Sequence, residues 1–129
     1  MMELGDGVRR LLDGPNMAHL ATILPDGSPH NVPVWIGTVG DQVAFQTGPG
    51  SRKARNVGAD PRVSVSITDQ SQPFTMAHIR GRVTGRIEGD QAWKIIDGFA
   101  VKYTGAPYQD HTDRVVYLIE PDHVQSTAY

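Results

Sequence analysis

The chain contains no cysteine. Disulfide bonds, thiolate metal sites and a cysteine nucleophile are therefore excluded, and any redox chemistry must come from a bound cofactor. The 12 basic and 14 acidic residues are scattered along the chain and give a formal charge of −2. Because no basic tract is suited to follow a nucleic-acid backbone, we expect no nucleic-acid partner.

Long apolar runs are also missing. No segment approaches the roughly 20 apolar residues that span a bilayer, and Glu3 and Asp6 lie where a secretion signal carries basic residues. We therefore expect a soluble, cytoplasmic protein that contacts no membrane. The composition does not change sharply along the chain, so residues 1–129 are expected to form one domain. A domain of this size has little volume for an enclosed active site, which favours a site shared by two subunits.

Short segments with β-strand character, separated by glycine and proline, make up most of the chain. Their residues are small, apolar or β-branched, or alternate with polar ones, which predicts strands over residues 17–23, 29–36, 42–47, 62–68, 74–88 and 114–119. The tight-turn sequence at residues 24–28 joins the first two strands in a hairpin. We expect residues 37–41 to form a turn and residues 122–129 to form a short tail after Pro121.

Helical spacing predicts three short helices. Val8, Leu11 and Leu12 lie on one face of the first, which a Gly-Pro pair ends. Ser51 is suited to be the N-cap of the second helix and Asp90 that of the third.

The order of these elements predicts the fold class. Helices do not separate every pair of strands, so a parallel α/β sheet is disfavoured. Gly81 and Gly85 are expected at bulges or corners of a curved sheet. Together these features predict a mainly β protein, a six- to seven-stranded Greek-key barrel with short helices.

A proline and several aromatic residues suggest where a flat ligand would lie. Pro33 lies inside an expected strand but has no N–H to donate, which confines it to an edge, a bulge or a place facing a planar ligand. Trp35 follows it, and Tyr103 and Tyr108 flank the start of the loop after the third helix, so aromatic faces are available. Packing in the core or at the barrel rim is the alternative, and it is favoured for Tyr103 by its helical register.

A glycine-rich turn at residues 48–50 leads into Ser51, Arg52, Lys53 and Arg55. Free N–H groups and the dipole at a helix N-terminus favour an anion, whereas cations there are unfavourable unless an anion joins them. Arginine can hold phosphate oxygens in a bidentate manner and lysine supplies a point charge, so the turn suits a phosphate group. The alternative is an ordinary solvated helix start with basic surface residues.

Other chemistries find no support in the sequence. The turn lacks the order of a Walker loop, and the third glycine and βαβ unit of a dinucleotide fold are absent. No Gly-x-Ser-x-Gly elbow indicates a hydrolase. We predict no metal site, because i, i+4 pairing is absent among the five histidines, His19, His30, His78, His111 and His123.

The chain resembles the pyridoxamine 5′-phosphate oxidase-like superfamily of split β-barrel flavoproteins, and within it the deazaflavin (F420)-dependent oxidoreductases. The motifs that carry this resemblance are Ala-His-Leu-Ala-Thr at 18–22, Pro-Asp-Gly-Ser-Pro-His at 25–30, Pro-Val-Trp at 33–35, Ser-Arg-Lys-Ala-Arg-Asn at 51–56, Asp-Pro-Arg-Val-Ser at 60–64 and Ile-Arg-Gly-Arg-Val at 79–83. The Ser-Arg-Lys and Asp-Pro-Arg-Val motifs are the most specific.

The resemblance implies a homodimer with two cofactor sites at the subunit interface, in each of which Arg52 and Lys53 hold the phosphate. It also implies that residues 31–36 run along the cofactor ring and that Gln46 and Thr47 lie near the ribityl chain. The cofactor-binding residues expected on this basis are Ser51, Arg52, Lys53, Arg55, Asn31, Val32, Pro33, Val34, Trp35, Gln46 and Thr47.

Coenzyme F420 is favoured over flavin mononucleotide (FMN), because the Pro-Val-Trp segment and residues 97–108 resemble the deazaflavin branch. The deazaflavin tail carries glutamates, which Lys102 or Arg55 would meet. The resemblance implies hydride transfer from the reduced cofactor to a small organic acceptor, with no side-chain nucleophile required. An FMN-dependent oxidase or reductase and a non-catalytic carrier of a flavin-like molecule remain alternatives.

Overall fold

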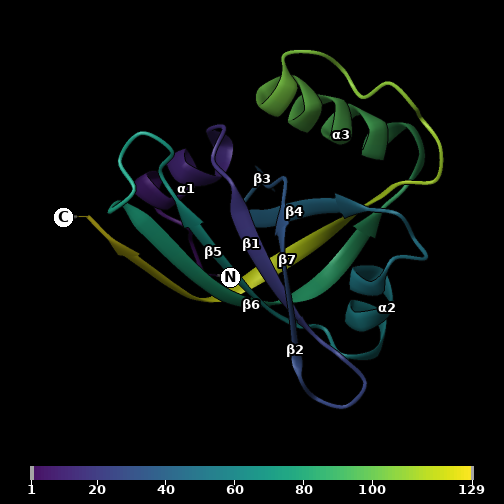
Figure 1. Cartoon of the computed structure of the whole chain (residues 1–129), viewed down its shortest axis with the longest axis horizontal. Helices are drawn as coiled ribbons and strands as arrows, with labels where there is room; N and C mark the ends of the chain where they lie inside the picture. Colours follow the sequence, from purple (N-terminus) through teal and green to yellow (C-terminus); the bar gives the residue numbers. More distant parts are fainter. Residues whose placement is uncertain (1, 129) are drawn as a thin grey trace.

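A computed structural model describes residues 2–128 as one seven-stranded antiparallel sheet with three helices (Figure 1). The strands are β1 (Ala18–Ile23), β2 (Pro29–Val34), β3 (Gly37–Val39), β4 (Gln42–Thr47), β5 (Arg62–Thr68), β6 (Met76–Ile87) and β7 (Val115–Thr127), and the helices are α1 (Asp6–Asp13), α2 (Arg52–Ala59) and α3 (Gly89–Thr104). In space the strands follow the order β2-β1-β5-β6-β7-β4-β3. The expected mainly β fold is confirmed.

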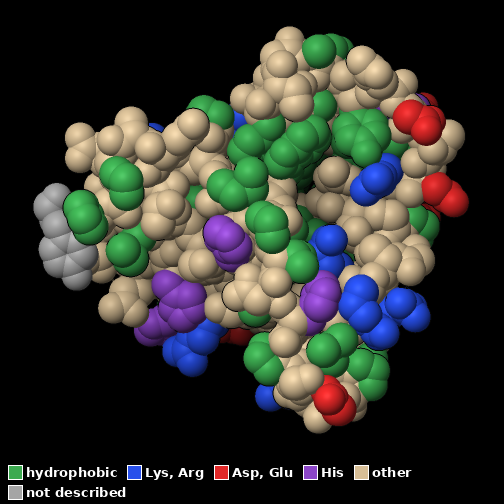
Figure 2. Space-filling model, viewed as in Figure 1, with side chains coloured by type: hydrophobic (Ala, Val, Ile, Leu, Met, Phe, Trp, Pro, Cys, Tyr) green, Lys and Arg blue, Asp and Glu red, His purple; other side chains and the backbone are tan. Residues whose placement is uncertain are grey.

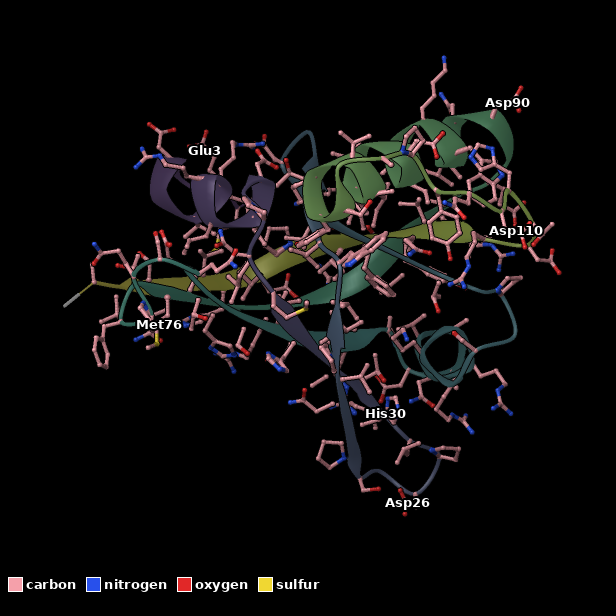
Figure 3. The ribbon with its side chains drawn as sticks, turned by 45° about the horizontal axis from the view of Figure 1, so that its top comes forward. Glu3, Asp26, His30, Met76, Asp90 and Asp110 are labelled. Atoms are coloured by element: carbon pink, nitrogen blue, oxygen red, sulfur yellow. The ribbon has the colours of Figure 1, made fainter. Side chains whose placement is uncertain are left out.

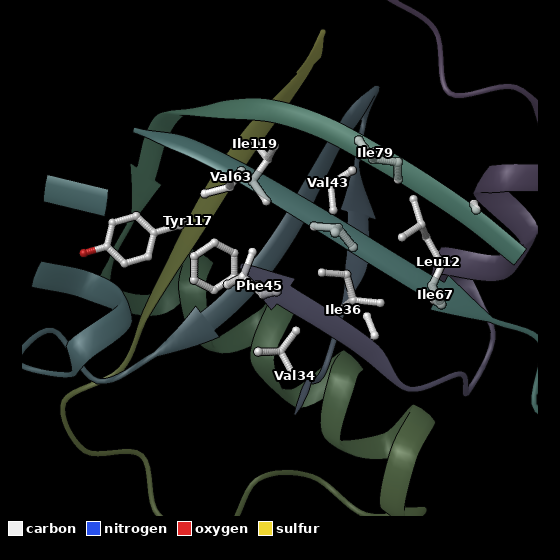
Figure 4. Close-up of a cluster of buried hydrophobic side chains, with 14 of the residues drawn as sticks. Leu12, Val34, Ile36, Val43, Phe45, Val63, Ile67, Ile79, Tyr117 and Ile119 are labelled. Carbon is white, nitrogen blue, oxygen red and sulfur yellow. The ribbon is translucent and has the colours of Figure 1, made fainter. Parts of the chain in front are cut away.

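The larger hydrophobic core fills the concave side of this sheet (Figure 4). Alternate residues of β1, β5 and β6 point into it, so the period-two pattern of the sequence becomes one apolar face. α1 closes this core, since Val8, Leu11 and Leu12 are buried against it as expected. Side chains with almost no solvent exposure include Leu20, Phe45, Val65, Ile79 and Ile119.

A second, smaller core lies between α3 and the opposite face of β4 and β7. Ala44 and Val116 from the strands pack with Ile96 and Phe99 from the helix. The approach is close, because a Cβ added at Gly37 would lie 2.4 Å from Cε1 of Phe99. β4 and β7 are therefore covered on both faces, and the loop that leaves α3 is brought to the end of β4 where the candidate site lies.

Three expectations about single residues in the sheet are confirmed. Pro33 lies on β2, which is the edge strand of the sheet, so its missing N–H interrupts no ladder. Gly81 and Gly85 lie at the two register shifts between β6 and β7. These irregularities bend the long β6–β7 pair, as bulges do in curved sheets.

Two local expectations are wrong. Residues 37–41 are not simply a turn, because Gly37 pairs with Ala44 and Val39 with Gln42, which makes β3 a short strand around a turn at Gly40. Pro121 does not end the last strand either. β7 continues to Thr127, because beyond residue 119 it pairs with β6 alone and Pro121 lies at a register shift. Residue 129 of the expected tail lies outside the described residues.

The expected cap of the third helix is also wrong. α3 begins at Gly89, its N-cap is Glu88, and no side chain makes the capping hydrogen bond. Gly89 has a φ of 68°, a left-handed conformation that glycine adopts without strain, and this conformation turns the chain from β6 into the helix one residue before Asp90.

Candidate cofactor-binding site

The start of α2 is built as the sequence predicts. The oxygen of the Ser51 side chain accepts a hydrogen bond from the Ala54 N–H at 3.1 Å, so Ser51 is the N-cap. The Thr47 hydroxyl, at the end of β4, donates to the Ser51 oxygen at 2.8 Å and ties the strand to the helix. The first turn of α2 has no acidic residue, so its positive dipole end is left for an external anion.

Two adjoining cavities open beside this helix start, and both are lined by Thr47, Lys53, Tyr108 and Arg114. The larger, of about 470 Å³, is lined further by Gly48, Ser51, Asp110, Thr112 and Asp113. The smaller, of about 250 Å³, is lined further by Pro33, Val34, Trp35 and Gln46. Figure 3 shows Asp110 on the loop after α3, on the same side of the molecule as α2.

The structure brings most of the expected cofactor-binding residues to these cavities, namely Pro33, Val34, Trp35, Gln46, Thr47, Ser51 and Lys53. Asn31 is exposed on β2, and Val32 packs against the larger core. Neither of these two residues lines the cavities beside Lys53.

Arg52 and Arg55 line a different cavity, of about 290 Å³, beneath the turn between β1 and β2. Consecutive residues of a helix point about 100° apart, so Arg52 and Lys53 face different sides of α2. The Arg52 Nε donates to the Asn56 side-chain oxygen at 2.9 Å, and the buried Asn56 amide donates to Thr22 at 3.0 Å. Within one chain, Arg52 and Lys53 therefore line two different cavities, although both were expected to hold the same phosphate.

A second cation, Arg114, lines both cavities with Lys53 and was not among the residues expected from the sequence. No local motif marks it, because it lies 61 positions further along the chain. Pairing of Thr47 with Val115 brings it beside the end of β4, where its Nη1 lies 3.5 Å from the Gln46 side-chain oxygen. Figure 2 shows several Lys and Arg side chains, together with acidic ones, on the side of the molecule that carries α2 and the loop after α3.

Burial lowers the pKa of Lys53, and the nearby charge of Arg114 lowers it further. Among residues 2–128, Lys53 has neither an ion pair nor a hydrogen bond. A partly buried ammonium group without a counter-charge is unfavourable, and an anion in the cavity would relieve that cost. The electrostatics of the site therefore suit a phosphate group.

Aromatic side chains form one wall of the smaller cavity. The Trp35 ring stacks on Tyr103 with centroids 5.5 Å apart, and Tyr108 meets Trp35 edge-on at 6.2 Å. Tyr103 lies behind this wall, where its hydroxyl donates to the Asn16 carbonyl at 2.7 Å and accepts from the Ile36 N–H at 3.2 Å. Trp35 is thus held in place by Tyr103, which itself lines neither cavity.

The loop over residues 105–114 is fastened to α3. The Tyr108 N–H donates to an Asp97 carboxylate oxygen at 3.1 Å, and His111 Nε2 lies 2.9 Å from the same oxygen. The His111 ring also stacks on Trp93 with centroids 4.2 Å apart. These contacts hold Tyr108 and Arg114 over the cavities.

Lys102 of α3 is half-buried behind the aromatic wall. Its ammonium donates to the Leu12 carbonyl at 2.8 Å and to the Ile36 carbonyl. Burial lowers its pKa to about 8, against the opposing charge of Asp13. The charged form of Lys102 therefore carries a cost in the folded protein that is absent from the unfolded chain.

This shift predicts how stability depends on pH. A lysine whose folded pKa is depressed destabilises the fold below that pKa, and the cost disappears as the pH rises toward 10.5, its ordinary value. The difference in the free energy of unfolding between the wild type and Lys102→Met should therefore shift in favour of the wild type by about 1 kcal/mol between pH 8 and 10. This magnitude allows for the partial exposure of Lys102, since solvent weakens the effect of burial. Urea unfolding of both proteins across this range measures it, and a constant difference would contradict it.

The fold and the cavities together define a split β-barrel with a cavity lined by Lys53 and Arg114 beside an aromatic wall. The family model of pyridoxamine 5′-phosphate oxidase matches residues 4–128, and the chain belongs to this family, whose members bind flavin-type cofactors. No helix among residues 2–128 is both long and apolar enough to cross a bilayer.

Solved structures agree with this assignment. An F420 reductase is 29% identical with a TM-score of 0.81, over 94% of this chain and 98% of its own. A conserved hypothetical protein from Mycobacterium tuberculosis is 26% identical with a TM-score of 0.74, over 94% and 82%. A putative pyridoxamine 5′-phosphate oxidase from Listeria innocua, 21% identical with a TM-score of 0.67 over 85% and 86%, shares the fold. No curated protein matches the chain significantly.

Proposed function

We propose that the chain is an oxidoreductase that uses coenzyme F420 and transfers hydride between this cofactor and a small organic molecule. The observation that carries the proposal is the continuity of the two cavities, which join Lys53 at the start of α2 to Pro33, Val34 and Trp35 on the edge strand. A molecule with a phosphate at one end and a flat ring at the other fits this arrangement. The likeness to an F420 reductase supports the choice of cofactor.

Each part of the site has a proposed role. Lys53 and the capped start of α2 hold the phosphate, Gln46 and Thr47 bind the polyol chain, and Pro33, Val34 and Trp35 lie along the ring. The bound deazaflavin supplies the hydride chemistry. The side chains need only position the reactants and exclude water, which agrees with a pocket whose lining contains no histidine or cysteine.

The remaining expected residues belong to the proposal only through a homodimer. Asn31, Val32, Arg52 and Arg55 lie away from the cavities of their own chain, so we propose that they border the cofactor site of the partner subunit. The shallow space available in a domain of 14.1 kDa favours such a shared site. The mass in solution tests it, since a strict monomer would remove these four residues from the site.

FMN is the second candidate cofactor, and one feature of the pocket favours it. Asp110 and Asp113 line the larger cavity and would repel the additional carboxylates of the deazaflavin tail. An FMN-dependent oxidase or reductase would use the same phosphate and ring positions. A carrier that binds either cofactor without turnover is the non-catalytic alternative.

Titration of the apo-protein with F420 and with FMN separates these functions. We expect the dissociation constant for F420 to be at least about tenfold lower, because the cofactor-binding segments resemble the deazaflavin branch, and Trp35 fluorescence should be quenched as the ring binds. Tight FMN binding without a response to F420 would reject the proposal. Consumption of reduced F420 with quinones, enones and biliverdin-like acceptors then distinguishes an enzyme from a carrier, which binds the cofactor but consumes none.

A further inference from the structure

We infer that Arg114 is a phosphate-binding residue, which together with Lys53 holds one anionic group where the two cavities meet and makes the site select phosphorylated cofactors over phosphate-free ones. The inference rests on the proposed function and adds a residue to its site. It also names the chemical group that discriminates between ligands.

Two cations lie beside the cavities without an ion pair to a protein carboxylate. Lys53 and Arg114 line both cavities, and the charge of Arg114 lowers the pKa of Lys53. Asp110 and Asp113 line the larger cavity too, but among residues 2–128 neither forms an ion pair with these cations. Two like charges at a partly desolvated position repel each other unless an anion lies between them.

The guanidinium of Arg114 is held in position from two sides. Its Cζ lies 5.6 Å from the centroid of the Tyr108 ring, and its Nη1 approaches Gln46 at 3.5 Å. The preceding residue, Asp113, has a φ of 43°, a left-handed conformation that aspartate tolerates better than most residues, and this conformation turns the chain into β7. Arginine has five N–H donors, so several stay available for oxygens in the cavity.

The part of the lining that belongs to β4 and α2 suits one phosphate group. The Ser51 oxygen accepts from the Thr47 hydroxyl and the Ala54 N–H, so the Ser51 hydroxyl keeps its own hydrogen for an anion, and the dipole at the start of α2 adds a partial positive charge. The cavity on the other side of α2 is different, because its Arg62 is paired with Asp60 at 2.8 Å and its Arg52 is bonded to Asn56. Lys53 and Arg114 are the cations of the larger cavity, and among residues 2–128 neither is paired with a carboxylate.

The test compares each cofactor with its phosphate-free form. Dissociation constants of the wild type, Arg114→Gln and Arg114→Lys are measured with FMN against riboflavin and with F420 against its phosphate-free deazaflavin alcohol. We expect Arg114→Gln to weaken binding of the phosphorylated ligand by about 10- to 100-fold, as loss of hydrogen bonds to a charged group does, and to leave the phosphate-free ligand within about twofold. Arg114→Lys should retain an intermediate affinity.

Arg86→Gln is the matched control. Arg86 also lies over a tyrosine ring, 5.8 Å from the centroid of Tyr117, but lines neither cavity, so its removal should change neither affinity. An unchanged preference for phosphorylated ligands in Arg114→Gln would overturn the inference. Equal weakening of both ligand forms would also overturn it, because Arg114 would then only shape the pocket.

Failure of the proposed function is distinguishable from failure of this inference. If the wild type binds neither flavins nor deazaflavins, the proposed function is rejected, and inorganic phosphate and pyrophosphate become the probes. An anion site at Arg114 would still be supported if these anions raise the melting temperature of the wild type and of Arg86→Gln but not that of Arg114→Gln. Stabilisation that is absent, or equal in all three proteins, would overturn it.

Discussion

Lys53→Gln is expected to weaken binding of the phosphorylated cofactor by about 100-fold. Lys53 lines both cavities, has no protein partner among residues 2–128, and lies beside the N-terminal end of α2. A charge-assisted hydrogen bond to phosphate contributes about 1.5–3 kcal/mol, and the helix dipole alone does not replace it. Fluorescence titration with F420 and FMN measures the loss.

Lys94→Gln is the control for this prediction. Lys94 is exposed on α3 and lines neither cavity, so the same change of residue type removes a charge away from the site. It should change the affinity less than about twofold. An affinity of Lys53→Gln equal to that of the wild type would contradict the phosphate assignment.

Gly81→Ala is expected to destabilise the fold by about 3 kcal/mol. A Cβ at this position would lie 2.3 Å from the Glu120 carbonyl oxygen and 2.9 Å from Cγ2 of Ile119. The first of these is backbone at the bend between β6 and β7, so the strands themselves must move, and such overpacking costs about 1–3 kcal/mol or more. Urea unfolding measures the loss: the midpoint concentration should fall, while the slope of the unfolding free energy against urea concentration stays unchanged.

Gly85→Ala separates this steric effect from the general effect of replacing a strand glycine. Gly85 lies on the same strand at the second register shift, but its added Cβ would lie 3.3 Å from Cδ1 of Leu118, the end of a flexible side chain. Alanine also restricts the unfolded chain, which contributes a gain of up to about 1 kcal/mol. The net change should stay within about 1 kcal/mol, and a loss as large as that of Gly81→Ala would show that close approach is not the cause.

The bend at Gly81 lies away from the candidate site. β7 pairs with β6 along most of its length and with β4 through residues 115–119. The second pairing places the beginning of β7 beside Thr47 and so brings Arg114 to the start of α2. Gly81 pairs with Pro121 in the middle of β7, whereas Arg114 immediately precedes the first residue of this strand.

Several features of the site follow from short-range chemistry and were predicted from the sequence. Ser51 caps α2 because a hydroxyl after a glycine-rich break satisfies a free N–H group, which is a contact over three residues. Pro33 lacks an N–H and therefore cannot donate a hydrogen bond to a neighbouring strand, and it lies on an edge strand, one of the few places in a sheet that tolerate proline. The resemblance motifs indicated the family, and the family model matches residues 4–128.

Other features depend on partners far apart in the chain. β3 exists because Gly37 meets Ala44, and β7 passes Pro121 because one of its edges has no neighbour there. Neither β3 nor the continuation of β7 could be predicted from neighbouring residues, because turn-forming residues and a proline have the same local preferences whether or not a strand lies beside them.

By itself, the sequence determined the class of the fold, the few kinds of place that Pro33 can take in a sheet and the anion-favouring start of α2, because strand alternation, a missing N–H and a helix cap are properties of neighbouring residues. Only the tertiary structure placed Pro33 on an edge strand and decided which cations line the cavity beside that helix start. Helical geometry turns Arg52 away from Lys53, and strand pairing brings Arg114 to it from the far end of the chain. Side-chain direction and long-range register arise when the sheet closes, so no local pattern contains them.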